Sequence, residues 1–103
     1  MPGLVRICSQ AQLPDEGEVR EVVASGRPFC VARVDGEIAV LDGLCPHHQG
    51  PLGQGMVENG RVICPFHAWA FDLKTGVAEH SARARVQVYE AIVEGGELLV
   101  RVP

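Results

Sequence analysis

Apolar residues in this chain occur in short runs separated by tight turns, and no segment keeps the helical apolar period of about 3.6 residues for long. Asp35-Gly36, Asn59-Gly60 and Gly95-Gly96 each lie between two apolar runs. Such pairs favour two-residue hairpin turns, because both residues of the turn need a positive φ. The pattern therefore predicts strands at residues 5–8, 19–23, 29–34, 38–41, 56–57, 62–63, 68–71, 86–93 and 98–102.

Short strands at this spacing are typical of an antiparallel all-β sandwich or a partly open barrel. Residues 73–76 are expected to form a further turn, and residues 12–17 a connecting turn or a short helix. The fifteen valines support this interpretation, because β-branched side chains favour a pleated sheet. At 103 residues, the chain is long enough for one hydrophobic core, so we expect a single domain.

Charge and hydropathy exclude several classes of function. The formal net charge of −4 argues against binding to nucleic acid or to anionic lipid. No apolar run approaches the ~20 residues that cross a bilayer, and the N-terminal residues do not resemble an export signal. We therefore expect a cytoplasmic protein with no membrane partner, whose four cysteines are reduced unless they bind a metal.

Two short Cys/His boxes carry the candidate chemistry. Cys45-Pro46-His47 and Cys64-Pro65-Phe66-His67 together offer two thiolates and two imidazoles, which complete a four-ligand set for a soft or borderline metal. In a reducing compartment, clustered Cys and His indicate metal ligands rather than disulfides. The first box follows a predicted strand and the second spans the junction of two, so neighbouring loops can share one site.

The residues alone leave a structural zinc ion open, because zinc also accepts two thiolates and two imidazoles. Zinc modules usually pair cysteines as Cys-x₂₋₄-Cys, which makes a zinc-stabilised interaction module the weaker interpretation. Cys8 and Cys30 lie in apolar runs and are expected to be buried core thiols. His48 has the wrong spacing for a ligand, and His80 lies in a polar stretch, so neither is included in the predicted site.

The segments 45–52 and 64–72 resemble the two cluster-binding boxes of Rieske [2Fe–2S] proteins, and residues 73–76 are similar to the exit turn of that family. The resemblance implies one [2Fe–2S] cluster, with Cys45 and Cys64 on one iron and His47 and His67 on the other. It also implies a Rieske-type fold. Residues 43–76 would form a small cluster-binding subdomain, and the remainder of residues 1–103 a basal β domain.

Departures from the respiratory branch of that family suggest a low reduction potential. By resemblance, Gly50 and Phe66 occupy the positions of two cysteines that cross-link the loops in that branch, and Trp69 and Phe71 occupy those of hydroxyl donors to cluster sulfur. Fewer donors leave the more negative, reduced state less stabilised. We therefore expect a potential near the lower end of the Rieske range, at about −150 mV.

The chain is not expected to be an enzyme. A Rieske oxygenase needs a second, mononuclear iron, and only His48 and His80 remain once His47 and His67 are assigned. The soluble branch of the family implies a monomeric ferredoxin that takes single electrons from a flavin-dependent reductase and passes them to a terminal aromatic-ring oxygenase. The alternative is a small Rieske subunit of an NAD(P)H nitrite reductase, which the sequence also resembles.

Overall fold

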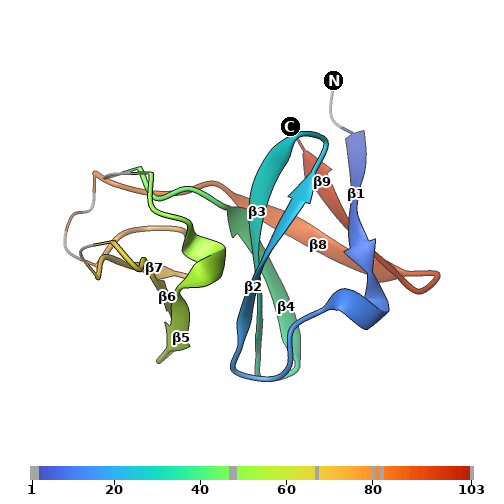
Figure 1. Ribbon diagram of the computed structural model, residues 1–103, viewed down its shortest axis with the longest axis horizontal. Helices are drawn as coiled ribbons and strands as arrows, with labels where there is room; N and C mark the ends of the chain where they lie inside the picture. The colour runs from blue at the N-terminus through green and yellow to red at the C-terminus, as the bar shows by residue number, and fades with distance from the viewer. Residues whose placement is uncertain (1–2, 47–48, 67, 80, 82, 103) are drawn as a thin grey trace.

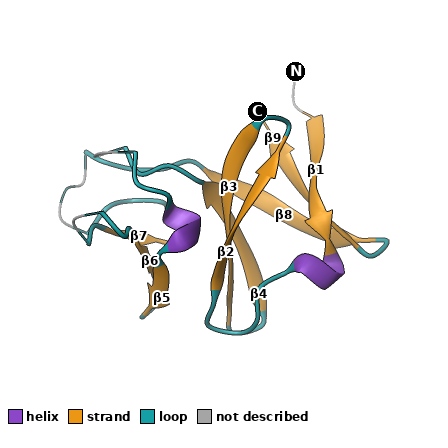
Figure 2. Ribbon diagram, viewed as in Figure 1, coloured by secondary structure: helices purple, strands orange, loops and turns teal. Residues whose placement is uncertain are grey.

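The computed structural model describes residues 3–46, 49–66, 68–79, 81 and 83–102. Its strands form two antiparallel sheets, one large and one small, that lie side by side (Figures 1 and 2). The large sheet has the order β1-β9-β8-β4-β3-β2, and the small sheet the order β5-β6-β7. In chain order the elements are β1 (Gly3–Ser9), η1 (Gln10–Gln12), β2 (Val19–Ala24), β3 (Arg27–Val34), β4 (Glu37–Asp42), η2 (Leu52–Gln54), β5 (Met56–Glu58), β6 (Arg61–Ile63), β7 (Ala70–Asp72), β8 (Val88–Glu94) and β9 (Glu97–Val102).

This architecture confirms the predicted antiparallel all-β fold, and the curled large sheet forms its partly open barrel (Figure 1). Each predicted strand overlaps an observed one. The three predicted hairpin turns also form, with positive φ at both central residues, for example 51° at Asn59 and 77° at Gly60. A fourth turn of the same kind, at Ser25 and Gly26 between β2 and β3, was not predicted. Among the described residues, no helix is long and apolar enough to span a membrane.

Two predicted strands begin later than expected. The strand predicted from residue 68 begins at Ala70, because Ala68 has a left-handed backbone with a φ of 56°. The strand predicted from residue 86 begins at Val88, because the N–H of Val86 donates to the carbonyl of Gly76 at 2.9 Å. In the first case the left-handed backbone of Ala68 limits the strand, and in the second a loop contact takes the hydrogen bond that would have extended it.

The connecting turn or short helix predicted at residues 12–17 is a turn at Glu16 and Gly17, closed by the N–H of Glu18, which donates to the carbonyl of Asp15 at 3.0 Å. A short 3₁₀ helix also forms, but earlier, at Gln10–Gln12. The side-chain oxygen of Gln12 accepts the backbone N–H of Ser9 at 3.0 Å, which caps this single 3₁₀ turn. The predicted turn at residues 73–76 forms as expected. There the carboxylate of Asp72 accepts the backbone N–H groups of Lys74 and Thr75 at 2.7 and 3.0 Å.

Strand β3 separates two hydrophobic cores. Phe29 and Val31 face a core within the large sheet, whereas Cys30 and Ala32 face a second core that includes residues of the small sheet. Because successive side chains of a strand point to opposite faces, this alternation explains why β3 is an unbroken apolar run. The second core also contains Cys45, Cys64 and Phe71, and it joins the two cysteine boxes to the large sheet.

Candidate metal centre

The first cysteine box is the tip of a narrow hairpin-like loop that leaves β4. The N–H of Leu52 donates to the carbonyl of Gly43 at 2.9 Å, and Leu44 forms a bridge with Pro51. Further out, the N–H of Cys45 donates to the carbonyl of Gly50 at 2.8 Å. These three contacts form a stem that ends at Cys45. We call residues 43–52 the first loop.

The second cysteine box is the tip of the hairpin made by β6 and β7. Val62 pairs with Phe71 and Ile63 with Ala70, and the N–H of Cys64 then donates to the carbonyl of Trp69 at 2.7 Å. The turn between Cys64 and Trp69 is therefore a direct continuation of the sheet. We call residues 64–69 the second loop.

The tips of the two loops have the same backbone geometry. In each, the cysteine N–H bonds to the carbonyl five positions later, and the residue before that carbonyl is left-handed, with φ of 58° at Gln49 and 56° at Ala68. His47 and His67 belong to these loops by sequence but lie outside the described residues, as do His48 and His80. Two unrelated stretches of chain thus present a cysteine in the same way.

The two loops meet at the cysteine sulfurs. Cys45 and Cys64 are each 1% exposed and belong to one core cluster. A Cβ placed on Gly50 would lie only 2.4 Å from the Sγ of Cys64, and 3.1 Å from the Cβ of Phe66. Gly50 is therefore a glycine because the sulfur of the opposite loop occupies its side-chain space.

The electrostatics of this sulfur pair favour a bound cation. Burial raises the pKa of the Cys64 thiol, the N–H of Phe66 lowers it through a bond to Sγ at 3.3 Å, and the neighbouring Cys45 raises it again. Two buried thiolates side by side repel each other, so a soft metal cation is the partner that lets both ionise. The donor set of Cys45 and Cys64 fits thiolate ligation of iron.

The structure brings Cys45 and Cys64 together, as the sequence predicted, and within its described part no group of three or more metal-ligating side chains converges elsewhere. Cys8 and Cys30 are buried free thiols, as expected. Burial raises the pKa of Cys30 to about 12, which keeps it protonated and inert. Phe71 is fully buried in the core beneath the loops, and Trp69 packs against the same cluster.

Sequence reasoning missed the left-handed residues Gln49 and Ala68 and the sulfur-facing role of Gly50. Positive φ is usually marked by Gly, Asn or Asp, so neither Gln nor Ala gives a signal. The only indication in the sequence is that Gln49 and Ala68 each lie four positions after a cysteine. By resemblance, Gly50 and Phe66 occupy the positions of two cysteines that are cross-linked in the respiratory branch. The closeness of these two residues in the structure is consistent with that correspondence.

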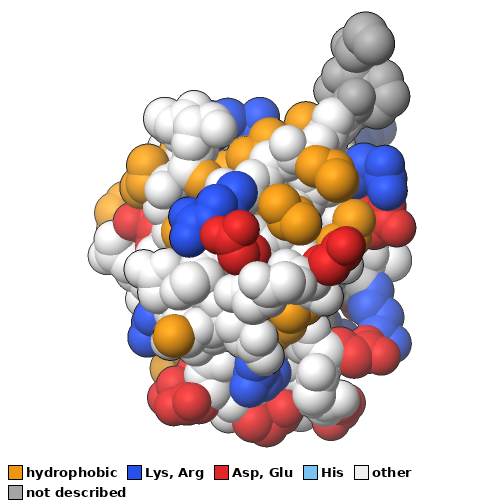
Figure 3. Space-filling view, turned by 90° about the vertical axis from the view of Figure 1, so that its right-hand side faces the viewer, with side chains coloured by type: hydrophobic (Ala, Val, Ile, Leu, Met, Phe, Trp, Pro, Cys, Tyr) orange, Lys and Arg blue, Asp and Glu red, His pale blue; other side chains and the backbone are white. Residues whose placement is uncertain are grey.

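The segments that carry the two cysteine boxes, residues 43–57 and 62–71, contain no acidic residue, lysine or arginine. Leu44 and Phe66, next to the two cysteines, are 40% and 48% exposed. On the face turned away from the small sheet, charged and apolar side chains are interspersed instead (Figure 3). The cysteine loops therefore offer a mainly apolar contact surface on an acidic protein.

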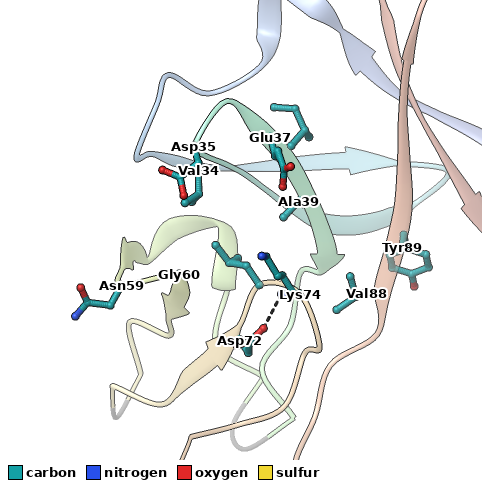
Figure 4. A pocket seen from close by; sticks show the side chains of 12 residues that line it. Val34, Asp35, Glu37, Ala39, Asn59, Gly60, Asp72, Lys74, Val88 and Tyr89 are labelled. Atoms are coloured by element: carbon teal, nitrogen blue, oxygen red, sulfur yellow. Dashed lines mark hydrogen bonds between the residues drawn. The ribbon is translucent and has the colours of Figure 1, made fainter.

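A pocket of about 370 Å³ lies between the two sheets, at the other end of the β5–β6 hairpin from Cys64. Asp35, Glu37 and Asp72 line it together with Lys74, which lies between the two sheets (Figure 4). Its lining includes neither cysteine loop. It is separate from the candidate metal centre.

Residues 3–90 match the Rieske [2Fe-2S] domain family. Because this match covers most of the chain, the protein belongs to that family. The match confirms the resemblance seen in the two cysteine boxes, and it identifies an iron–sulfur cluster as the cofactor of this domain.

Among curated relatives, the ferredoxin subunit of anthranilate 1,2-dioxygenase from Burkholderia cepacia is 33% identical over 88 residues, which are 84% of this chain and 82% of that protein. Cholesterol 7-desaturase nvd 1 from Ciona intestinalis is 42% identical over 72 residues, 68% of this chain, but the chain spans only 15% of that protein. The chain is thus similar both to small ferredoxin components and to one part of longer proteins.

Solved structures share the fold, and three of them illustrate the similarity. The Sphingomonas yanoikuyae B1 ferredoxin is 31% identical with a TM-score of 0.85, covering 98% of this chain and all of that one. The complex of reduced oxygenase and oxidized ferredoxin in carbazole 1,9a-dioxygenase gives 28% identity and a TM-score of 0.79, covering 94% of this chain and 91% of that one. The nitrite reductase small subunit from Mycobacterium tuberculosis, at 22% identity and a TM-score of 0.85, covers 100% and 97% and shows the fold alone.

Proposed function

We propose that this member of the Rieske family is an electron carrier, a ferredoxin that passes single electrons to a terminal aromatic-ring oxygenase. It would hold one [2Fe–2S] cluster, with Cys45 and Cys64 on one iron and His47 and His67 on the other. The observation that carries the proposal is the pair of matching loops, which turn two buried sulfurs toward each other. In this proposal residues 43–76 are the cluster-binding part of a single domain.

The mixed ligand set suits one-electron transfer. When bound, a cluster with two thiolate and two neutral imidazole ligands starts near zero charge and accepts an electron more readily than an all-cysteine cluster. The chain holds the two cysteines in a buried site whose backbone is tied by hydrogen bonds, which limits rearrangement when the charge changes. The N–H of Phe66 donates to Sγ of Cys64 at 3.3 Å. The positions of the hydroxyl donors are held by Trp69 and Phe71, which supports a potential of about −150 mV.

The partner at the cysteine end is proposed to be an oxygenase. Support comes from the similarity to dioxygenase ferredoxin components and to a ferredoxin solved in complex with its oxygenase. Leu44 and Phe66 provide exposed apolar contacts beside the sulfurs. The net charge of −4 would guide a monomeric carrier toward a less acidic partner at long range.

The electron donor is proposed to be a flavin-dependent ferredoxin reductase, and the location the cytoplasm. A permanent role as the small subunit of a nitrite reductase is the second candidate, and the shared fold is what favours it. It is the weaker one, because the relatives at 30% identity or more that match over most of their length are ferredoxin components. A free monomer on purification supports the carrier, whereas a stable complex with a large reductase subunit supports the alternative.

The first experiment is a visible and paramagnetic-resonance spectrum of the purified protein before and after reduction with dithionite. We expect a reddish-brown protein with equal iron and acid-labile sulfide and a rhombic signal on reduction. Cys45→Ser and His67→Ala should each abolish or strongly weaken these features, whereas Cys30→Ser should keep them. A colourless protein that contains zinc and no labile sulfide would overturn the proposal.

A redox titration tests the expected potential. We expect a midpoint near about −150 mV, and a midpoint above about +100 mV would contradict the low-potential assignment. Mixing the reduced protein with an aromatic-ring dioxygenase then tests the direction of transfer, through reoxidation of the carrier as substrate is consumed.

A further inference from the structure

We propose that Arg27, Asp42 and Tyr89, which we call the clamp, position the first cysteine loop on the large sheet. They come from β3, β4 and β8, and they meet where β4 ends and the first loop begins. The inference builds on the proposed function, since it names what sets the direction of the loop that carries Cys45. The contacts of the clamp exist whatever metal the loops hold.

The side chains of the clamp form a closed set of hydrogen bonds. The Tyr89 hydroxyl donates to Oδ1 of Asp42 at 2.5 Å, and the Arg27 guanidinium donates to the same oxygen at 3.4 Å and to the tyrosine oxygen. The guanidinium also lies 5.1 Å from the ring centre of Phe29 and 5.6 Å from that of Tyr89. The guanidinium, the hydroxyl and the carboxylate therefore each form hydrogen bonds with both of the other two groups.

The clamp continues into the backbone of the first loop. Asp42 exchanges hydrogen bonds with Gln87, from Asp42 N–H to the Gln87 carbonyl at 3.0 Å and from Gln87 N–H to Oδ2 of Asp42 at 3.3 Å. The next residue, Gly43, donates its N–H to the carbonyl of Pro28 at 3.1 Å and approaches Pro28 so closely that a Cβ would clash at 2.7 Å. Gly43 is also the base of the stem that ends at Cys45. Asp42 therefore sets the direction of that stem.

The second loop is supported by a different structure. Its stem is the backbone ladder of β6 and β7, which reaches Cys64 through Ile63 and Ala70. Loss of the clamp should therefore loosen the first loop and leave the second unchanged. This asymmetry separates a positioning role from a general contribution to folding.

The state of Tyr89 suits a permanent donor. Its side chain is 6% exposed. Burial and the Asp42 carboxylate on β4 raise the pKa of Tyr89 and Arg27 on β3 lowers it, so that together they raise it to about 12. The hydroxyl remains protonated at neutral pH and keeps its bond to the ionised carboxylate, the stronger kind of hydrogen bond.

The test is hydrogen exchange of the purified protein, followed by mass spectrometry on peptides from the first loop and from β6 to β7. Tyr89→Phe removes the hydroxyl and keeps the ring. We expect the amides of Cys45 and Leu52 to exchange about tenfold faster, as the loss of a charge-assisted hydrogen bond predicts, while that of Cys64 changes less than about twofold. Asp42→Asn should give the same pattern and serves as a second variant if Tyr89→Phe does not fold.

Arg101→Gln is the matched control, because it breaks an ion pair with Glu90 at 2.7 Å in the same sheet, away from the loops. It should leave both loops unchanged. In the cluster-loaded protein, the paramagnetic signal should shift in Tyr89→Phe but not in Arg101→Gln. An unchanged first loop in both clamp variants, or equal acceleration in the two loops, would overturn the clamp. The metal content tests the proposed function separately, because the exchange pattern does not depend on it.

Discussion

The two cysteine loops share one tip geometry but differ in what supports it. The second loop continues the pairing of β6 and β7, so backbone hydrogen bonds reach Cys64 without interruption. The first loop leaves the large sheet at Asp42 and is supported by side chains and close backbone contacts. The comparison teaches that the same hydrogen-bonded turn can form in two places, while the direction in which each turn points depends on the residues around its stem.

The glycines show the same contrast. A Cβ on Gly43, Gly50, Gly53, Gly55 or Gly76 would meet another atom at less than 3.0 Å, and four of these five lie in or directly after the first loop. The other seven glycines have open space around them, and most have a positive φ in a turn. The first loop thus packs closely against its neighbours at positions where a glycine leaves no Cβ. We expect replacement of these glycines by larger residues to be tolerated least.

The largest effect is expected where the two loops touch. In Gly50→Ala, the new methyl group would lie 2.4 Å from the sulfur of Cys64, so the loops must separate. We expect iron and acid-labile sulfide to fall to a small fraction of the wild-type content. Gly3→Ala, whose Cβ meets nothing within 4 Å, is the control and should keep the full content. A normal cluster in Gly50→Ala would show that the loops do not meet at this point.

The next effect tests how η2, which directly follows the first loop, rests on β2. In Gly53→Ala, the methyl group would lie 2.4 Å from Cα of Glu21, a backbone atom that cannot turn aside. We expect the free energy of unfolding in urea to fall by about 2–3 kcal/mol. Gln54→Ala removes only an exposed side-chain contact to Glu21 at 3.3 Å and should cost less than about 0.5 kcal/mol. Equal losses in the two variants would contradict this packing.

Alkaline pH should release the clamp. The pKa of Tyr89 is raised from 10.0 to about 12 in the folded protein. The unfolded chain therefore loses this proton first, and the stabilisation is complete below pH 10 and lost as pH rises from 10 to about 12. The contribution is up to about 2 kcal/mol. Because Tyr89 is the only tyrosine, tyrosinate absorbance follows this step directly.

The measurement compares urea unfolding of the wild-type protein and Tyr89→Phe across this pH range. The difference in free energy of unfolding between the two should shrink as pH rises. The buried thiol of Cys30 also contributes to alkaline destabilisation, but it is present in both proteins and cancels. A difference that stays constant from pH 10 to 12 would show that Tyr89 does not titrate in the way its surroundings indicate.

The smallest effect tests what the loops share. Gln49 and Ala68 both have a left-handed backbone, which costs an L-residue about 1–2 kcal/mol, whereas glycine adopts it freely at some entropic cost. Gln49→Gly and Ala68→Gly should each stabilise the protein by up to about 1 kcal/mol in thermal unfolding. Effects of opposite sign in the two loops would show that the two loop tips are not equivalent.

Much of the fold was predictable because its signals are local. Asn59-Gly60 specifies a tight turn by the φ values that its residues accept, and the alternation along β3 indicates a strand whatever lies next to it. The strand starts at Ala70 and Val88 were not predictable. At the first place the left-handed Ala68 interrupts the extended backbone without a sequence signal, and at the second the N–H of Val86 bonds to the carbonyl of Gly76 instead of to a strand.

The sequence by itself determined the family, the antiparallel all-β class and the four residues proposed as ligands, because short spacings and turn residues encode them. Only the tertiary structure decided that the sulfurs of Cys45 and Cys64 face each other across Gly50, and that Asp42 is bound to Tyr89 and Arg27. These contacts join residues far apart in the chain. Their existence depends on how the two sheets pack, and no local pattern records that packing.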